Sequence, residues 1–213
     1  KIFRDYKLPV SIGEVVFNAE EALNVANRSG ANAWVLGRDN VIMEIEAWHS
    51  YSSETPDFWR RAKADYPTHA GRFTGSPAYF KHIYSASEKL LNKMAMKSTD
   101  FKYGVFHMPN GSFPLKVGSM LGFSREQIMP SYVVPELGNS YSASALMGLV
   151  SVLDVAQPGD RIFFASYGSG AGSDAIAFKV TSEILNKRHS FKEAITEKKY
   201  ITYGEYMKYM NMI

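Results

Sequence analysis

Residues 161–180, RIFFASYGSGAGSDAIAFKV, hold two apolar runs on either side of a glycine-rich turn. Arg161 to Ala165 and Ala175 to Val180 are rich in the aromatic and branched residues that favour β-strands. The turn between them lacks the Gly-Lys-Ser/Thr ending of a phosphate-binding loop and the glycine spacing of a dinucleotide-binding fingerprint. Two interpretations of this turn remain: a tight hairpin in which glycine supplies positive φ, or a close approach of the backbone to a ligand.

The segments before this turn alternate between helical and strand-like patterns. Ala143 to Val155 is apolar on most faces and predicts a buried helix. Ser76-Pro77 predicts a helix start, because serine favours the N-cap and proline the first turn, and apolar residues then recur at helical spacing as far as Met94. Phe101 to Phe106 predicts a strand, and helical sequence resumes near Pro114. This alternation indicates an α/β layered fold.

The first third of the chain carries weaker signals. Glu20 to Ser29 predicts a helix, and Ala33 to Leu36 with Val41 to Trp48 predicts a β-hairpin. The polar stretch that follows predicts a short helix around Asp57 to Lys63. No repeat or linker divides the sequence, so we expect residues 1–213 to form one continuous domain piece. Since the chain begins at Lys1, we expect either a processed chain or a fragment of a longer one.

The composition narrows the range of functions. The chain has 46% hydrophobic and 21% charged residues, close to the average of globular proteins. Its net charge of +3 suits an anionic ligand but is too small to predict a nucleic-acid interface. The absence of cysteine excludes a disulfide scaffold, a thiolate metal site and a cysteine nucleophile on these 213 residues. The longest apolar run, Ala145 to Leu153, is too short to cross a membrane, and no motif predicts a metal site.

Three polar residues stand beside the predicted elements and are candidates for a site. His107 follows the strand that ends at Phe106, where open α/β sheets place their ligands, although a lone histidine is also compatible with a structural role. Asn139 precedes the buried helix, where helix capping is the alternative role. Ser169 lies in the glycine-rich turn and lacks the Gly-x-Ser-x-Gly elbow of serine hydrolases.

Five segments, taken in order, resemble the carboxy-terminal part of archaeal-type 3-hydroxy-3-methylglutaryl-CoA (HMG-CoA) synthases, members of the thiolase superfamily. They span almost the whole chain and are 52–61 (SSETPDFWRR), 71–82 (GRFTGSPAYFKH), 107–111 (HMPNG), 138–144 (GNSYSAS) and 166–170 (SYGSG). The resemblance implies an α/β fold, one half of the pseudo-duplicated, layered α/β/α thiolase architecture. It also implies a Claisen-type condensation of acetyl-CoA with acetoacetyl-CoA through an acetyl-cysteine, on the route to mevalonate and isoprenoids.

The same resemblance assigns roles to individual positions. His107 would act as acid and hydrogen-bond donor towards the acetoacetyl ketone. Asn139 and Ser169 would position acyl oxygens, and Thr74 would contact the acyl group. Coenzyme A would be bound by Arg72, Ser112 and Lys116.

The sequence departs from the family pattern in three places. Ser112 stands where archaeal relatives usually carry a lysine that helps to hold coenzyme A. Val25-Ala26 replaces a small hydroxyl residue expected near the substrate. The family's cysteine nucleophile and glutamate base belong to an amino-terminal half that has no counterpart in these residues.

The resemblance implies several partners: the missing amino-terminal half, a second copy in a homodimer, and an archaeal complex with acetoacetyl-CoA thiolase and a bridging zinc/OB-type protein. It further implies a cytoplasmic enzyme that uses coenzyme A thioesters as substrates, with no cofactor, metal, nucleic acid or membrane contact. Two alternatives stay open. A non-catalytic acyl-CoA-binding or scaffold subunit is favoured by Ser112 and by the absence of a cysteine nucleophile, and it is opposed by His107, Asn139 and Ser169. A ketoacyl-synthase-type condensing enzyme, which also pairs histidine with asparagine, is opposed by the stretch TPDFWRR at 55–61.

Overall fold

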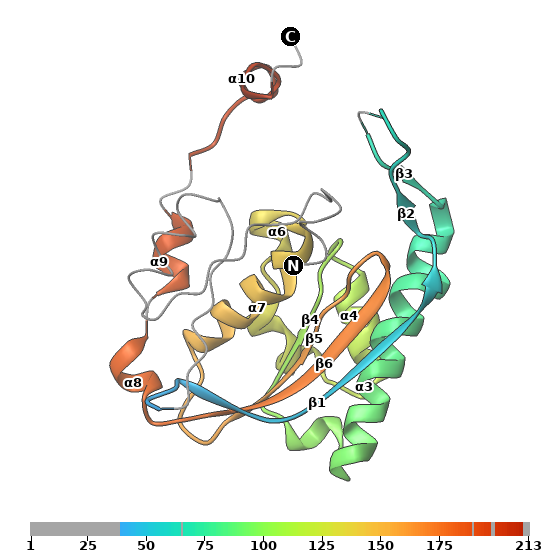
Figure 1. Cartoon of the computed structure of the whole chain (residues 1–213). Helices are drawn as coiled ribbons and strands as arrows, with labels where there is room; N and C mark the ends of the chain where they lie inside the picture. Colours follow the sequence, from blue (N-terminus) through green and yellow to red (C-terminus); the bar gives the residue numbers. More distant parts are fainter. Residues whose placement is uncertain (1–38, 65, 189, 197–198, 211–213) are drawn as a thin grey trace. The chain divides into compact units, whose positions relative to one another are not determined.

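A computed structural model describes residues 39–64, 66–188, 190–196 and 199–210 of the chain. The residues from Val41 onwards form one compact unit around a four-stranded sheet of order β1-β6-β5-β4, shown in Figure 1. The strands are β1 (Met43–Thr55), β4 (Tyr103–Phe106), β5 (Arg161–Ala165) and β6 (Gly170–Val180). β4 and β5 are parallel, whereas β6 runs antiparallel to both β5 and β1.

Helices cover both faces of this sheet (Figure 1). α3 (Phe80–Met94) packs on β1 and β6, and α7 (Ser144–Leu153) packs on β4 and β5. Because side chains alternate along a strand, Phe163 and Ala165 of β5 join the core on the α3 side, while Ile162 and Phe164 point to the other face. The other elements are η1 (Gly71–Thr74), η2 (Gly75–Tyr79), η3 (Ser98–Asp100), α4 (Phe113–Met120), α5 (Arg125–Ile128), η4 (Met129–Ser131), α6 (Val134–Leu137), η5 (Tyr141–Ala143), α8 (Ile184–Lys187), α9 (Phe191–Thr196) and α10 (Tyr203–Tyr209).

The start of α3 agrees with the sequence signal. Ser76 has extended backbone angles, φ −127° and ψ 121°, as an N-cap residue does, and helical angles begin at Pro77. The helix ends at Ala95, which adopts the left-handed conformation with φ 53° and closes the last turn. The predicted strand before His107, the helix near Pro114 and the buried helix before Pro158 are also confirmed.

The glycine-rich turn is a hairpin that joins β5 to β6. β6 begins at Gly170, five residues before the predicted Ala175, because Gly170 and Gly172 to Asp174 pair with β1 beyond the point where the β5 ladder ends. Gly170 has φ +107°, a backbone conformation that side chains rarely allow, which explains the choice of glycine there.

The predicted helix at Asp57 to Lys63 is wrong. β1 continues to Thr55, and the residues beyond it form a second, two-stranded hairpin of β2 (Phe58–Trp59) and β3 (Thr68–His69). The Asp57 carboxylate accepts a hydrogen bond from the Phe58 backbone N–H at 2.9 Å, and the Ala70 N–H donates to the Asp57 carbonyl at 2.9 Å, so both groups serve the hairpin instead of a helix.

Some expected features fall outside the described residues: the helix at Glu20 to Ser29, the strand at Ala33 to Leu36 and the Val25-Ala26 pair. In the described part of the chain, no helix has both the length and the apolar character that a membrane span needs.

α7 approaches the sheet closely at Gly148. A Cβ atom there would lie 2.9 Å from the Ser131 carbonyl oxygen and 3.3 Å from a methyl carbon of Val105 in β4. Only glycine fits this contact without a shift of the backbone. The close approach brings the beginning of α7 next to the residues that follow β4, where His107 lies.

Candidate active site

His107 stands directly after β4, at the carboxyl ends of the two parallel strands. Its backbone N–H donates to the Ala165 carbonyl of β5 at 2.9 Å, so the β4–β5 ladder fixes its position. The residue is only 6% exposed. The sequence-based placement of His107 at the carboxyl end of a strand is therefore confirmed.

Two hydroxyl groups hold the backbone around His107. The Tyr79 hydroxyl donates to the His107 carbonyl at 2.6 Å. The Ser144 hydroxyl, at the first residue of α7, accepts from the Met108 N–H at 2.9 Å and donates to the Met108 carbonyl at 3.2 Å. The starts of α3 and α7 thus clamp the same short segment from two sides.

The His107 imidazole lies among aromatic rings and carries a polar atom without a partner. Its ring centroid is 6.3 Å from that of Tyr79 and 6.0 Å from that of Tyr167. Nδ1 is buried and makes no hydrogen bond within the described residues. Burial lowers the pKa of His107 from 6.5 to about 4, so the ring is neutral at pH 7 and carries one N–H. A buried polar atom without a partner is rare in folded proteins, and a functional role of the ring is one reason for it.

Ser169 lies in the hairpin turn, and a neighbouring carboxylate fixes that turn. Asp57 is fully buried, and its Oδ1 accepts from the Gly170 N–H at 2.8 Å while its Oδ2 accepts from the Tyr167 hydroxyl at 2.5 Å. Burial and the Asp57 carboxylate raise the pKa of Tyr167, which keeps its phenol protonated. Asp57 thus orders both the turn that carries Ser169 and the ring that packs against His107.

Sequence reasoning missed Asp57 as a site residue. Asp57 lies within the family-like segment 52–61, and the polar sequence around it predicts a short helix, which gives no reason to expect a buried carboxylate. The sequence signal that could have indicated its burial is its position between Pro56 and the two aromatic residues Phe58 and Trp59. A buried aspartate needs partners, and those partners stand more than a hundred residues further along the chain.

His82 is a second group whose surroundings the sequence did not indicate. It is fully buried in α3, and its Nδ1 lies 2.6 Å from the Ala78 carbonyl, so Nδ1 carries the proton. Nε2 lies 2.8 Å from the Ser53 hydroxyl oxygen and forms a hydrogen bond with it. His82 therefore has two partners, and it links β1 to the start of α3.

Asn139 lies in the loop before η5 and is exposed. Its Oδ1 accepts from the Tyr141 N–H at 2.9 Å, so the side chain caps a local turn instead of the buried helix. In the described residues no hydrogen bond joins Asn139 to His107. Asn139 and the residue after His107 are linked only indirectly: Asn139 lies five residues before Ser144, and the Ser144 hydroxyl accepts a hydrogen bond from the Met108 N–H.

The four residues assigned to the acyl group and coenzyme A come from two adjacent segments. Arg72 is exposed in η1, and the half-buried Thr74 donates to the Gly71 carbonyl at 2.8 Å. Ser112 and Lys116 are exposed one turn apart at the start of α4. The segments meet at Gly75, where a Cβ atom would lie 2.9 Å from the Phe113 ring.

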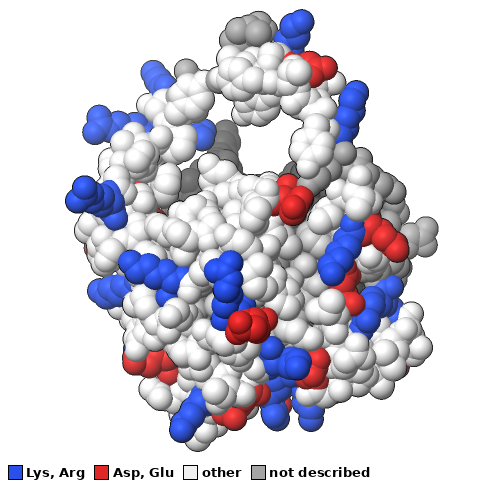
Figure 2. Space-filling model, turned by 180° about the vertical axis from the view of Figure 1, so that it is seen from behind, with Lys and Arg blue, Asp and Glu red and all other residues white. Residues whose placement is uncertain are grey.

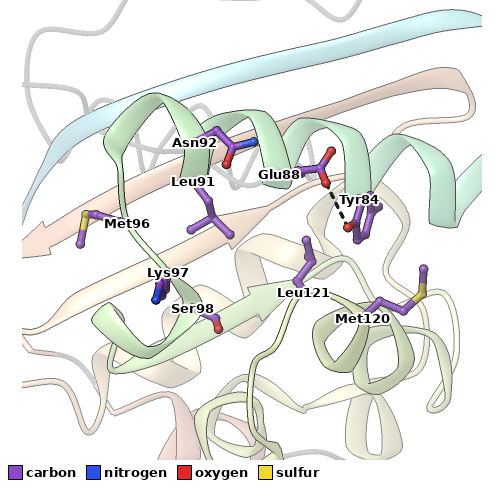
Figure 3. Close-up of a pocket in the computed structure, with 9 residues that line it drawn as sticks. All are labelled: Tyr84, Glu88, Leu91, Asn92, Met96, Lys97, Ser98, Met120 and Leu121. Atoms are coloured by element: carbon purple, nitrogen blue, oxygen red, sulfur yellow. Dashed lines mark hydrogen bonds between the residues drawn. The ribbon is translucent and has the colours of Figure 1, made fainter.

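A pocket in the described part of the chain lies away from His107. It has a volume of about 320 Å³ and lies between the carboxyl-terminal halves of α3 and α4, where Glu88, Leu91, Lys97 and Met120 contribute to its lining (Figure 3). Glu88 is eight residues beyond Phe80, roughly 12 Å along the helix axis from the end of α3 that leads to Tyr79. No histidine is among the residues that line it, so this pocket is separate from the His107 site.

Neither a single-sign charged patch on the face drawn in Figure 2 nor a cluster of metal-binding side chains in the described residues marks a further site. Figure 2 shows lysine and arginine side chains interspersed with acidic ones over the body of the molecule on that face. Across the described ranges, no group of three or more His, Asp and Glu side chains is arranged to hold a metal ion.

A protein-family comparison supports the fold. Residues 91–180 match the family model described as the carboxy-terminal domain of 3-oxoacyl-[acyl-carrier-protein] synthase III. A solved structure described as HMG-CoA synthase complexed with CoA superposes with a TM-score of 0.68 at 20% identity, covering 78% of this chain and 47% of that one. The chain therefore has a thiolase-like α/β layered fold.

Curated relatives give closer sequence matches. The chain is 49% identical over 191 residues to a hydroxymethylglutaryl-CoA synthase of Methanopyrus kandleri, and 49% identical over 195 residues to one of Archaeoglobus fulgidus. These matches cover 88% and 91% of this chain, and 55% and 57% of the two relatives. The chain thus spans little more than half the length of the curated relatives it matches.

Proposed function

Because the chain is homologous to the carboxy-terminal part of archaeal HMG-CoA synthases, we propose that it supplies one half of the active site of such an enzyme. The reaction is the Claisen-type condensation of acetyl-CoA with acetoacetyl-CoA in the mevalonate pathway: acylation of the cysteine releases coenzyme A, the acetyl group adds to the ketone, and water then cleaves the cysteine thioester to release 3-hydroxy-3-methylglutaryl-CoA. The observation that carries the proposal is His107: a buried, neutral imidazole at the end of β4, with a ring nitrogen that no described residue occupies.

The chemistry needs a donor where negative charge develops. When the carbanion of an acetyl group attacks the ketone of acetoacetyl-CoA, the ketone oxygen becomes an alkoxide. A neutral imidazole N–H donates to this oxygen more strongly as its charge grows, so it favours the transition state over the bound ketone. His107 is the acid in this proposal; Asn139 and Ser169 position acyl oxygens and Thr74 contacts the acyl group.

The remaining catalytic groups come from a complementary segment. The chain contains no cysteine, so the acetyl-carrying cysteine and the glutamate base of the proposed enzyme belong to an amino-terminal half. We propose that the two halves form a cytoplasmic homodimeric enzyme, with coenzyme A thioesters as its substrates and no further cofactor. An association with acetoacetyl-CoA thiolase and a bridging zinc/OB-type protein is part of the same proposal.

A fusion protein tests this function. The amino-terminal part of the Methanopyrus kandleri relative, joined to this chain in place of the homologous segment, should release coenzyme A when given acetyl-CoA and acetoacetyl-CoA together. The 213-residue chain alone should not. A fusion protein that folds and binds coenzyme A without any condensation would instead favour the second candidate, a non-catalytic acyl-CoA-binding subunit. That candidate is supported by the presence of Ser112 and by the lack of cysteine in the chain.

Ser112→Lys should tighten the binding of coenzyme A by roughly threefold at low salt. The new cation would stand one turn before Lys116, so two ammonium groups would face the phosphates, and the gain should shrink as salt screens the charges. The Asn110 side chain should still cap α4, since its Oδ1 accepts the backbone N–H groups of residues 112 and 113 at 2.9 and 3.1 Å.

Calorimetric titration of the chain with coenzyme A at two salt concentrations measures this gain. Ser119→Lys, an exposed serine nearer the other end of α4, is the matched control and should not tighten binding. An equal gain in both variants would mean that only the net charge matters.

A further inference from the structure

Lys116 is held over an aromatic ring instead of beside a carboxylate. Its Nζ lies 4.9 Å from the centroid of the Phe80 ring, within the range of a cation–π interaction. Lys116 comes from α4 and Phe80 is the first residue of α3, so the contact joins two elements. No salt bridge to Lys116 occurs among the residues that the structure describes.

The Phe80 ring is itself fixed by its neighbours. Its centroid lies 4.9 Å from that of Phe113 and 5.1 Å from that of Tyr79, and the latter pair meets edge to face. Tyr79 in turn is fully buried and bonded to the His107 carbonyl. The ring under Lys116 therefore belongs to the packed wall that also positions His107.

An aromatic partner differs from a carboxylate in its effect on the charge. A carboxylate would neutralise the ammonium group and occupy its N–H donors, whereas a ring face attracts the cation and leaves its charge and most donors available. A lysine that is already confined in this way also loses less rotamer freedom when an anion binds. The arrangement prepares Lys116 for an anionic ligand.

We propose that Phe80 is a positioning residue that holds Lys116 for the phosphates of coenzyme A. This inference rests on the proposed coenzyme A site. Gly75 packs against the Phe113 ring, which belongs to the same aromatic cluster as Phe80. Arg72 lies three residues before Gly75, so a second cation comes from a segment that borders this cluster.

The binding of coenzyme A to the full 213-residue chain tests the role of Phe80. Phe80→Leu should weaken binding about threefold at low salt, Phe80→Tyr should retain wild-type affinity, and Phe80→Leu should cause no further loss in a Lys116→Ala background. Lys93→Ala removes a similar cation–π contact, 5.4 Å from the Trp48 ring at the far end of α3, and should leave binding unchanged. Equal losses with and without Lys116 would overturn the proposal.

A second measurement separates this inference from the proposed function. In the ligand-free chain, the ring current of Phe80 should shift the ε-methylene proton resonances of Lys116, assigned through Lys116→Arg, and Phe80→Leu should remove that shift. If the shift is present but Lys116→Ala leaves coenzyme A affinity unchanged, the contact exists and the coenzyme A role of both residues is wrong. If Phe80→Leu leaves the resonances in place, Phe80 does not position Lys116.

Discussion

In the fusion protein, His107→Ala should slow condensation by a factor of about a hundred or more, in line with typical contributions of a positioned acid. The formation of the acetyl-enzyme should fall much less, because the acetyl-carrying cysteine belongs to the other half. The physical reason is that the alkoxide forms only in the condensation step, so a donor at residue 107 is needed there and not earlier.

The test measures covalent acetyl-enzyme and HMG-CoA separately in the same variant. His49→Ala, which removes another histidine from β1, is the control and should leave both steps unchanged. Equal losses in the two steps, or none, would assign His107 a structural role. His107→Asn should recover part of the condensation rate, because its amide also donates a hydrogen bond.

The lowered pKa of His107 also predicts a pH dependence of stability. The unfolded chain binds a proton at this position below about pH 6.5, while the folded chain does so only near pH 4. Stability is unaffected by His107 above pH 6.5, and it decreases as the pH falls from 6.5 to 4, where the unfolded state binds more protons. His107→Ala should therefore flatten the dependence of the unfolding free energy on pH across that interval.

Asp57→Ala should lower the free energy of unfolding of the chain by about 3 kcal/mol, because three donors lose their acceptor. These donors are the Tyr167 hydroxyl and the backbone N–H groups of Phe58 and Gly170. Tyr167→Phe removes only one of the three bonds and should cost about 1 kcal/mol.

Urea denaturation of the chain measures both losses. Asp174→Ala is the matched control: that aspartate is exposed and accepts from the Ser50 hydroxyl at 2.5 Å, so its removal should cost less than about 0.5 kcal/mol. If Asp57→Ala and Asp174→Ala cost the same, the Asp57 network contributes little to stability. In the fusion protein, Asp57→Ala should also slow condensation, since the turn with Ser169 loses its anchor.

The sequence predicted the parts of the site that local signals encode. Ser76-Pro77 marks a helix start by its own chemistry, and the strand before His107 is short, apolar and directly followed by the candidate residue. The assignment of roles to Asn139, Ser169 and the coenzyme A residues depended on the resemblance to a family, and these roles remain proposals.

What the sequence could not predict depends on distant contacts. Asp57 is polar and follows proline, so local rules place it on the surface, and two of the three donors that satisfy its buried carboxylate come from the distant residues Tyr167 and Gly170. His82 likewise looks like an exposed helical residue until Ser53 supplies a partner. The Phe80–Lys116 contact joins residues on two helices, and no pattern along the chain relates them.

The pairing of β1 with β6 has a consequence for how the protein is made. Met43 lies opposite Val180, so the edge strand finds its partner only after a further 130 or so residues have been synthesised, and closing so large a loop is slow. β4 and β5 are also parallel and need a long crossover before they can pair. Between the synthesis of Thr55 and that of Gly170, the nascent chain therefore carries the thirteen residues of β1 without their β6 partner, and these residues are a segment that a chaperone has reason to shield.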